Sequence, residues 1–290
     1  MIMILTQCKK DENNNSFSVT TKTASSITTS GAILNGTITG NSGVTTVVFE
    51  WGLTSSYGNI DTADQSPVSG VSAINVTYTL NKLSGGTTYH YRVVAITSSG
   101  KTYGSDIFFT TLPPELVLIH TSFGNMLIWL YDQTPLHKAN FLTLTKSNYY
   151  DSLIFHRVVP NFVIQGGDPL GNGTGGPGYT IPAEFNDSLT HVYGAVAAAR
   201  LPDAQNPLKS SSGSQFYIVV NKAGYHSLDK NYTVFGLVID GMAAADAIVA
   251  VPRDAQDKPL TNVYMTKVEV VTYTPAQLKA QFNFTIPRFK

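Results

Sequence analysis

The sequence predicts a mainly β protein of two domains, a β-sandwich followed by a domain that mixes strands with two helices. Three observations predict this class. A chain of 290 residues is long enough for about two domains, and 42% apolar residues suffice for their cores. Residues 16–111 alternate between apolar and polar side chains with the period of a strand. Beyond residue 115 two segments are predicted as helices, the first from its start signal and both from their apolar residues, which favours an α+β or barrel domain.

Charge and composition exclude several classes of function. Lys and Arg together number 19, as do Asp and Glu, so the net charge is zero, and no basic stripe is visible. A nucleic-acid partner is therefore not expected, because phosphate binding needs clustered cations. No run of about 18 apolar residues could span a membrane as a helix, and the single cysteine, Cys8, cannot form an intramolecular disulfide.

The first residues form a short apolar stretch that ends at Cys8 and is followed by a polar run through Ser16. This arrangement resembles the end of a bacterial lipoprotein signal, with Leu5 three residues before the cysteine. The resemblance implies that residues 1–15 are a signal remnant and linker, and that Cys8 is lipidated. It also implies a cell-envelope protein on the periplasmic or outer-membrane surface, attached to the membrane by the lipid anchor only. An ordinary N-terminus with a chance cysteine is the alternative.

The first domain is predicted from short alternating segments separated by Gly, Ser and Asn turns. Their spacing suits a β-sandwich of about seven strands, and no run has the period or length of a helix. The segments are residues 32–38, 47–51, 75–80, 88–95 and 106–110.

One segment of this domain is more specific. Leu83-Ser-Gly-Gly-Thr-Thr-Tyr-His-Tyr91 resembles the signature of fibronectin type III domains, and Trp51–Gly58 resembles bacterial versions of the same domain. The resemblance implies an immunoglobulin-like sandwich over residues 16–112, in which Tyr89 or Tyr91 forms the tyrosine corner. We find no catalytic constellation in this part of the sequence, and we expect a spacer or interaction module.

The sequence from Leu112 to Glu115 contains two prolines, which predict a short stiff linker. The second domain is then expected over residues 115–274. It opens with strands predicted at 116–120 and 125–131, followed by a helix with Thr134 as N-cap and Pro135 at its first position. A second helix is predicted at 241–251. The weakly amphipathic tail, 275–290, is either a docking segment or disordered.

The most informative segment for chemistry is Phe155–Asp168, which reads as two apolar strands joined by a Pro-Asn turn. Arg157 is the single charge in its strand, and a charge there is costly unless it is paired or faces a cleft. A surface-facing arginine on an edge strand would explain the pattern equally well. The glycine pair after Gln165 indicates a sharp bend or a close approach of two backbones.

This segment resembles the cyclophilin signature, Phe-His-Arg followed by apolar residues, Pro, a turn residue, Phe and Gln-Gly-Gly-Asp. Two further motifs of that family follow in order, at Ser212–Ile218 and Leu228–Gly236, and the glycine loop Gly171–Gly176 fits as well. That loop neither follows a strand nor opens a helix, so a dinucleotide site is not expected. The resemblance covers about residues 115–273 and implies a cyclophilin-like closed eight-stranded antiparallel β-barrel capped by two helices.

The resemblance also assigns roles to residues. Arg157 is implied as the catalytic residue, with His156 flanking the site and Gln165 and Gln215 holding the peptide backbone. The other implied substrate-binding residues line a proline pocket or contribute backbone to the groove: Phe162, Val163, Tyr217, Leu228, Tyr232, Ala199 and Arg200. No cofactor and no metal is expected.

The sequence departs from the family at the pocket. Val163 stands where Met is usual, Tyr217 where Phe is usual, and Tyr232 where His is frequent. The loop from Leu201 to Ser212 is also longer than in short members. These changes keep the arginine and the aromatic floor, so activity is expected with an open substrate preference.

Arginine suits this chemistry. Resonance in the prolyl amide gives a rotation barrier of about 18–20 kcal/mol, and a twisted amide exposes a lone pair on its nitrogen. A guanidinium aimed at that nitrogen, as the resemblance implies for Arg157, stabilises the twisted form more than the planar one, which is catalysis by differential binding.

The predicted function is therefore a peptidyl-prolyl cis/trans isomerase that acts on X-Pro bonds of exported proteins, with proline-containing peptides and unfolded exported proteins as partners. The alternative is a non-catalytic proline-peptide binding or adhesion module tethered to the cell surface. A carbohydrate-degrading enzyme is not supported, because we can place no carboxylate pair.

Overall fold

The computed structural model describes residues 17–287, so the predictions for the N-terminal signal and Cys8 lie outside the described residues. The chain divides into two compact units, residues 1–113 and 114–290, and the division falls inside the predicted proline linker. None of the helices in the described residues is long and apolar enough to cross a membrane.

The described part of the first unit contains nine strands, where the sequence predicted about seven. Four of the five predicted segments lie within strands, and the fifth, 106–110, begins one residue before its strand. The bounds are β1 (Ser18–Ser25), β2 (Ala32–Thr39), β3 (Asn41–Gly52), β4 (Gly58–Thr62), β5 (Val68–Gly70), β6 (Ile74–Leu80), β7 (Thr88–Thr97), β8 (Gly100–Tyr103) and β9 (Ile107–Thr110). They form one sheet in the order β1-β2-β6 and a second in the order β4-β3-β7-β8, with β5 pairing with β3 and β9 pairing with β7.

The two sheets contribute to one apolar core. Alternate residues of β2 are buried, including Leu34 and Ile38, and they join Phe49 and Val93 of the second sheet in this core. Two tyrosines of β7 connect the core to the backbone. The hydroxyl of Tyr89 accepts a hydrogen bond from the Ser84 amide at 3.0 Å, and the hydroxyl of Tyr91 donates to the Lys22 carbonyl.

The second unit combines ten strands, three α-helices and one 3₁₀ turn in its described residues. The strands are β10 (Glu115–Thr121), β11 (Gly124–Leu130), β12 (Arg157–Val159), β13 (Val163–Gly166), β14 (Thr180–Ile181), β15 (Ala195–Ala198), β16 (Ser211–Ser212), β17 (Phe216–Val219), β18 (Val234–Asp240) and β19 (Lys267–Thr272). The helical elements are α1 (Pro135–Lys146), η1 (His226–Leu228), α2 (Met242–Val249) and α3 (Pro275–Phe282). Both predicted helices are therefore present, together with a third.

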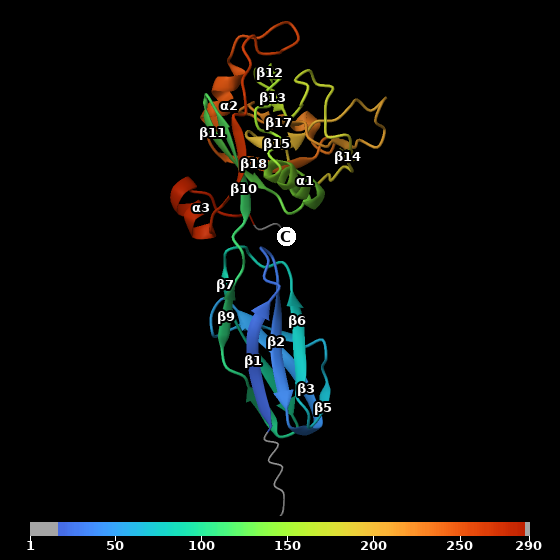
Figure 1. The fold of residues 1–290 in the computed structure, drawn as a ribbon, viewed down its shortest axis with the longest axis vertical. Coiled ribbons are helices and arrows are strands. Elements are labelled where there is room, and N and C mark those ends of the chain that lie inside the picture. Colours follow the sequence, from blue (N-terminus) through green and yellow to red (C-terminus); the bar gives the residue numbers. More distant parts are fainter. Residues whose placement is uncertain (1–16, 288–290) are drawn as a thin grey trace, which may run out of the picture. The chain divides into compact units, whose positions relative to one another are not determined.

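Eight of these strands form one curled sheet in the order β12-β13-β17-β15-β18-β11-β10-β19 (Figure 1). The prediction of a closed barrel is wrong, because the two edge strands β12 and β19 do not pair with each other in the described structure. Instead, the irregular segments that precede these two strands are hydrogen-bonded to each other. The Ser152 amide donates to Met265 O at 2.8 Å, Met265 N donates to Leu153 O, and Phe155 N donates to Val263 O. The regular ladder is therefore open, and short loop segments cross the gap.

Side-chain alternation gives this sheet two apolar faces with separate cores. Val158, Ile164 and Ile218 belong to the inner core, which also holds residues of α1 and α2. Their strand neighbours Val163 and Tyr217 belong to a second, outer core. Because successive strand residues point to opposite faces, a single strand supplies both cores. We call these two sets the inner core and the outer core.

The start of α1 is stabilised differently from the prediction. Thr134 occupies the N-cap position, but its side chain makes no capping hydrogen bond. The carboxylate of Glu184 accepts instead from the amides of Leu136 at 3.0 Å and His137 at 2.9 Å. Amides at a helix start lack intrahelical partners, so a carboxylate from a distant loop can satisfy them.

The tail that the sequence left undecided forms a docked helix. Thr274 and Gln277 make a complete capping box at the start of α3, which explains why the helix begins there. Leu278 is fully buried in the outer core, and the ring centroids of Phe284 and Trp129 are 5.5 Å apart. In Figure 1, α3 lies beside β10, which contributes Leu116 to the same core.

Candidate active site on the outer face of the sheet

Three predicted site residues lie in one row across neighbouring strands. The Cα of Arg157 is paired with that of Gln165 between β12 and β13, and Gln165 is paired with Tyr217 of β17. Residues directly opposite each other in antiparallel strands point to the same side of a sheet. The register therefore presents the guanidinium, the amide and the aromatic ring on the outer face.

The Arg157 side chain is partly exposed, and its guanidinium carbon lies 5.7 Å from the centre of the Phe162 ring. We find no ion pair or hydrogen bond to this guanidinium within residues 17–287. A cation held over an aromatic face without a carboxylate keeps its donors for another group. Arg157 is therefore a partly exposed, unpaired cation on the edge strand β12, which fits the surface-facing alternative as well as a role in binding.

The two glutamines are tied to each other and to the glycine loop. Gln165 Nε2 donates to Gln215 Oε1 at 3.1 Å, and Gln215 Nε2 donates to the carbonyls of Gly173 at 3.0 Å and Gly175 at 2.8 Å. Both N–H groups of the Gln215 side chain therefore donate within the chain. Gln165 keeps its carbonyl oxygen and one N–H beside Arg157, which suits it to contact a bound peptide.

The bend predicted after Gln165 is present. Gly167 has φ +83, and a Cβ there would lie 2.2 Å from the Ser214 carbonyl, so two backbones meet closely. Asp168 follows and fixes the glycine loop, since its carboxylate accepts from the amides of Leu170, Asn172 and Gly173. Burial alone would raise the pKa of Asp168, but these amide donors outweigh it and lower the pKa.

The predicted pocket residues gather at one end of the outer core. Val163 and Tyr217 are buried, and partly buried neighbours pack against them: Phe162, Ala199, Leu228 and Tyr232. Tyr225 was not among the predicted site residues. Its ring centroid lies 4.4 Å from that of Phe162, and about one-third of its surface is exposed. These side chains form an apolar cluster that reaches Arg157 through Phe162, and its residue types suit contact with a prolyl ring.

Arg200 closes one side of this region through its side chain. Its guanidinium lies 4.5 Å from the Tyr232 ring centre and donates to the Asn231 carbonyl and the Asp203 carboxylate. The Ala199 amide already donates to Gln215 O at 3.0 Å, whereas we find no hydrogen bond to the Arg200 backbone in the described residues. Of the two backbones predicted for the groove, that of Arg200 is the one available to a peptide.

His156 differs from the other predicted residues because it is buried, with 6% of its surface exposed. Its Nδ1 has no hydrogen-bond partner in the described part of the chain. Burial is the main cause that lowers the pKa of His156, and neighbouring Arg157 adds to it. His156 therefore lies beneath the site as a neutral side chain rather than on its surface.

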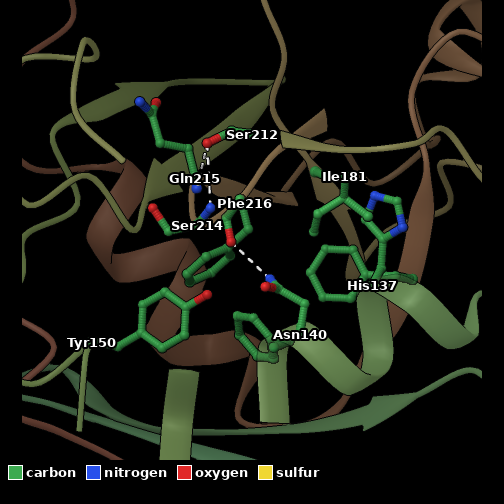
Figure 2. Close-up of a pocket in the computed structure, with 12 residues that line it drawn as sticks. His137, Asn140, Tyr150, Ile181, Ser212, Ser214, Gln215 and Phe216 are labelled. Atoms are coloured by element: carbon green, nitrogen blue, oxygen red, sulfur yellow. Dashed lines mark hydrogen bonds between the residues drawn. The ribbon is translucent and has the colours of Figure 1, made fainter. Parts of the chain in front are cut away.

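A small cavity lies on the inner-core side of the sheet, and Gln215 of the predicted site is among the residues that line it. It measures about 10 Å³ and is lined by His137, Asn140, Tyr150 and residues that precede β17. Figure 2 shows these side chains around it, with the amide of Gln215 directed away. This volume is about that of one water molecule, so the cavity cannot hold a prolyl residue.

The sequence did not predict a buried chain of hydrogen bonds that ends at Tyr217. His191, fully buried, lies with Nε2 3.0 Å from the Tyr217 hydroxyl and Nδ1 2.7 Å from Asp229 Oδ1. Burial lowers the pKa of His191, although Asp229 partly offsets this, and burial raises the pKa of Tyr217 well above its usual value. The only sequence signal was a lone histidine before β15, which is not specific.

Three buried histidines make the fold sensitive to acid. Burial lowers the pKa of His137, His156 and His191 below the value of about 6.5 that they have when unfolded. The unfolded chain then binds more protons than the folded chain below that pH, so stability falls as the pH drops from about 6.5 toward the lowered pKa values. We expect a lower melting temperature at about pH 5.5 than at about pH 7.5.

Calorimetry across this range checks the expectation. Asp168 and Asp229, whose pKa values lie below 3.8, contribute only at more acidic pH and do not confound it. A variant such as His191→Asn, which removes one of the three titrations, should lose part of the acid sensitivity. An unchanged or higher melting temperature on acidification would contradict the prediction.

Comparison with known proteins agrees with this geometry. Residues 116–270 match the family described as cyclophilin type peptidyl-prolyl cis-trans isomerase/CLD. A peptidyl-prolyl cis-trans isomerase-like 3 of Dictyostelium discoideum is 38% identical over 159 residues, which are 53% of this chain and 94% of that protein. A Streptococcus pyogenes protein whose name carries both a phosphatase and a peptidyl-prolyl cis-trans isomerase is 37% identical over 185 residues, but the chain spans only 38% of its length.

Solved structures agree as well. The crystal structure of a Cryptosporidium parvum cyclophilin type peptidyl-prolyl cis-trans isomerase matches with a TM-score of 0.51 and 30% identity, covering 55% of this chain and 98% of that one. The same enzyme in the presence of the dipeptide Ala-Pro matches at 0.50. The prediction of a cyclophilin fold and of an isomerase is confirmed at the level of the family. Since the family match spans more than half of the chain, this protein belongs to the cyclophilin-type peptidyl-prolyl cis-trans isomerases.

Proposed function

We propose that the second unit catalyses cis/trans isomerisation of X-Pro bonds and that Arg157 supplies the decisive hydrogen-bond donor. The observation that carries the proposal is the row of Arg157, Gln165 and Tyr217 on the outer face, with a guanidinium that has no carboxylate partner in the described residues. We propose that the apolar cluster around Phe162 and Leu228, which reaches Arg157 through Phe162, forms the apolar depression that takes the prolyl ring.

The mechanism follows from differential binding. In the planar amide the nitrogen lone pair is delocalised, and rotation must overcome a barrier of about 18–20 kcal/mol. As the bond twists, the lone pair localises on nitrogen and can accept a hydrogen bond from Arg157. An interaction that exists only in the twisted state lowers the barrier, and each tenfold acceleration requires about 1.4 kcal/mol of it. The apolar depression holds the prolyl ring so that the rest of the peptide rotates.

Substrate recognition would combine this depression with a few polar contacts. We expect Gln165 and the backbone of Arg200 to bind peptide N–H and C=O groups, and Phe162 and Tyr217 to contact the prolyl ring; their shared outer face supports this. The Cryptosporidium relative crystallised in the presence of Ala-Pro supports proline-containing peptides as the ligand class. We extend this to unfolded exported proteins as the natural substrates.

A protease-coupled assay on a prolyl tetrapeptide tests the proposal with the full chain. We expect clear acceleration over the spontaneous reaction, which takes tens to hundreds of seconds at 25 °C. A folded protein that gives only the spontaneous rate would overturn the catalytic proposal. It would leave a non-catalytic module that binds proline peptides, which titration with the same peptide would detect.

For the first unit we propose a fibronectin type III-like sandwich that acts as a spacer or interaction module. Two features support this proposal. The two sheets share one core, and the Tyr89 hydroxyl bonds back to the Ser84 amide five residues upstream, as a tyrosine corner does. A chain without residues 17–113 should retain isomerase activity on a tetrapeptide if the proposal is correct.

We further propose that the protein is exported to the cell envelope and anchored by lipid at Cys8, on the strength of the lipoprotein-like residues Leu5 to Cys8. Intact mass of protein extracted from membranes should show a diacyl or triacyl addition at Cys8, and Cys8→Ser should release the protein into the soluble fraction. A mass without acyl chains would contradict this proposal.

A further inference from the structure

The proline pocket contains a polar group that an apolar pocket does not need. Tyr217 is 4% exposed and belongs to the outer core, next to the partly buried Leu228 and Tyr232. A phenylalanine ring would fill the same wall without a hydroxyl. A buried hydroxyl is costly unless it is hydrogen-bonded, so the position of its partner decides what the pocket offers to a ligand.

The partner of this hydroxyl is His191, and the geometry fixes which atom donates. Asp229 Oδ1 accepts from the His191 backbone amide at 2.8 Å and lies 2.7 Å from Nδ1 of the ring. Although burial alone would raise the pKa of Asp229, its hydrogen bonds with His191 and His226 lower it, so the carboxylate is ionised. Nδ1 must therefore carry the ring proton, which leaves Nε2 as the acceptor for the Tyr217 O–H at 3.0 Å.

The same chain connects two walls of the pocket. Tyr217 belongs to β17, whereas Asp229 directly follows Leu228 at the end of η1. Two hydrogen bonds through a fully buried imidazole thus join the strand that carries the aromatic wall to the turn that carries the aliphatic wall. On the solvent side, a second histidine contacts Asp229: His226 Nδ1 lies 2.9 Å from the other carboxylate oxygen, Oδ2.

We propose that His191 and Asp229 are positioning residues for the isomerase: they hold the Tyr217 hydroxyl away from the prolyl ring and set the spacing between Tyr217 and Leu228. The pocket then presents an apolar ring face despite its tyrosine. This inference rests on the proposed function, because it concerns how that site binds its substrate.

The test replaces the imidazole by amides of two lengths. His191→Asn can still reach Asp229 from the Nδ1 position but leaves the Tyr217 hydroxyl without an acceptor. His191→Gln places an acceptor near the Nε2 position. We expect His191→Asn to lower kcat/KM for a prolyl tetrapeptide by about tenfold, chiefly through a higher KM, because an unpaired hydroxyl weakens ground-state and transition-state binding alike.

A double variant makes the inference falsifiable. Adding Tyr217→Phe to His191→Asn removes the unpaired hydroxyl, so we expect the double variant to recover to within about threefold of Tyr217→Phe alone. His191→Gln should retain more activity than His191→Asn. Tyr193→Phe, which removes an outlying hydroxyl bonded to Asp246, is the matched control and should leave both constants unchanged.

The outcomes separate the two proposals. If the wild-type chain is inactive, the proposed function and this inference fall together. If the wild type is active and His191→Asn equals it, or the double variant stays as impaired as His191→Asn, the positioning role is wrong and His191 serves packing alone. Melting temperatures measured alongside show whether a loss of activity reflects unfolding, because a purely structural defect would not be rescued by Tyr217→Phe.

Discussion

Replacing Arg157 by alanine is expected to lower kcat/KM for a prolyl tetrapeptide by about a hundredfold or more, because it removes the donor that acts only on the twisted amide. The fall should appear in kcat, since the interaction is absent from the planar ground state. Stability should change little. The guanidinium has no ion-pair partner in the described residues, so its removal leaves no buried group unpaired.

Two controls sharpen this experiment. Arg157→Lys retains the charge but loses the planar array of donors, and it should recover only a minor part of the rate. Arg253→Ala makes the same chemical change at a surface ion pair with Asp257 and should leave activity unchanged. Wild-type activity in Arg157→Ala would remove the arginine from the mechanism and shift attention to desolvation by the pocket.

Replacing Leu278 by alanine is expected to destabilise the second unit by about 2–5 kcal/mol, the usual cost of deleting a fully buried leucine side chain. Leu278 is the buried anchor of α3 in the outer core, where Phe282 and Phe284 also pack. Its loss removes apolar burial and opens a cavity beneath a helix that lies outside the residues matched to the family.

Fluorescence can assign this unfolding to the correct unit. The chain has two tryptophans, Trp51 in the first unit and Trp129 in the second, so Trp51→Phe leaves Trp129 as the reporter beside Phe284. Guanidinium unfolding in this background should show a lower midpoint for Leu278→Ala. Leu208→Ala, at a site 82% exposed, is the matched control. Equal midpoints for the two variants would mean that α3 adds no stability.

Local patterns in the sequence predicted most of the fold. Alternation placed both ends of β2, β7 and β11 to within two residues, and the Thr-Pro start placed α1. The same alternation, with the family resemblance, brought Arg157 and Gln165 to one face, because their register requires only the Pro-Asn turn between β12 and β13. These features depend on neighbouring residues, which a single sequence displays.

Other features depend on residues far apart in the chain, and the sequence could not show them. Whether β12 pairs with β19 depends on the irregular segments that precede the two strands and bond to each other instead, and the resemblance alone suggested closure. The carboxylate at the start of α1 comes from Glu184, 47 residues beyond His137. His191 and Asp229 are 38 residues apart, and neither lies in a pattern that implies a hydrogen bond to Tyr217.

The position of β19 and α3 has a consequence for the order of events during synthesis. β19 pairs with β10, and His120 lies 149 positions before its hydrogen-bond partner Glu269. A chain that emerges from the ribosome can finish the first unit while β10 still lacks this neighbour and the outer core lacks Leu278. An apolar face therefore stays uncovered until residue 286 has emerged from the ribosome, and a chaperone or a protease has that interval in which to act on it.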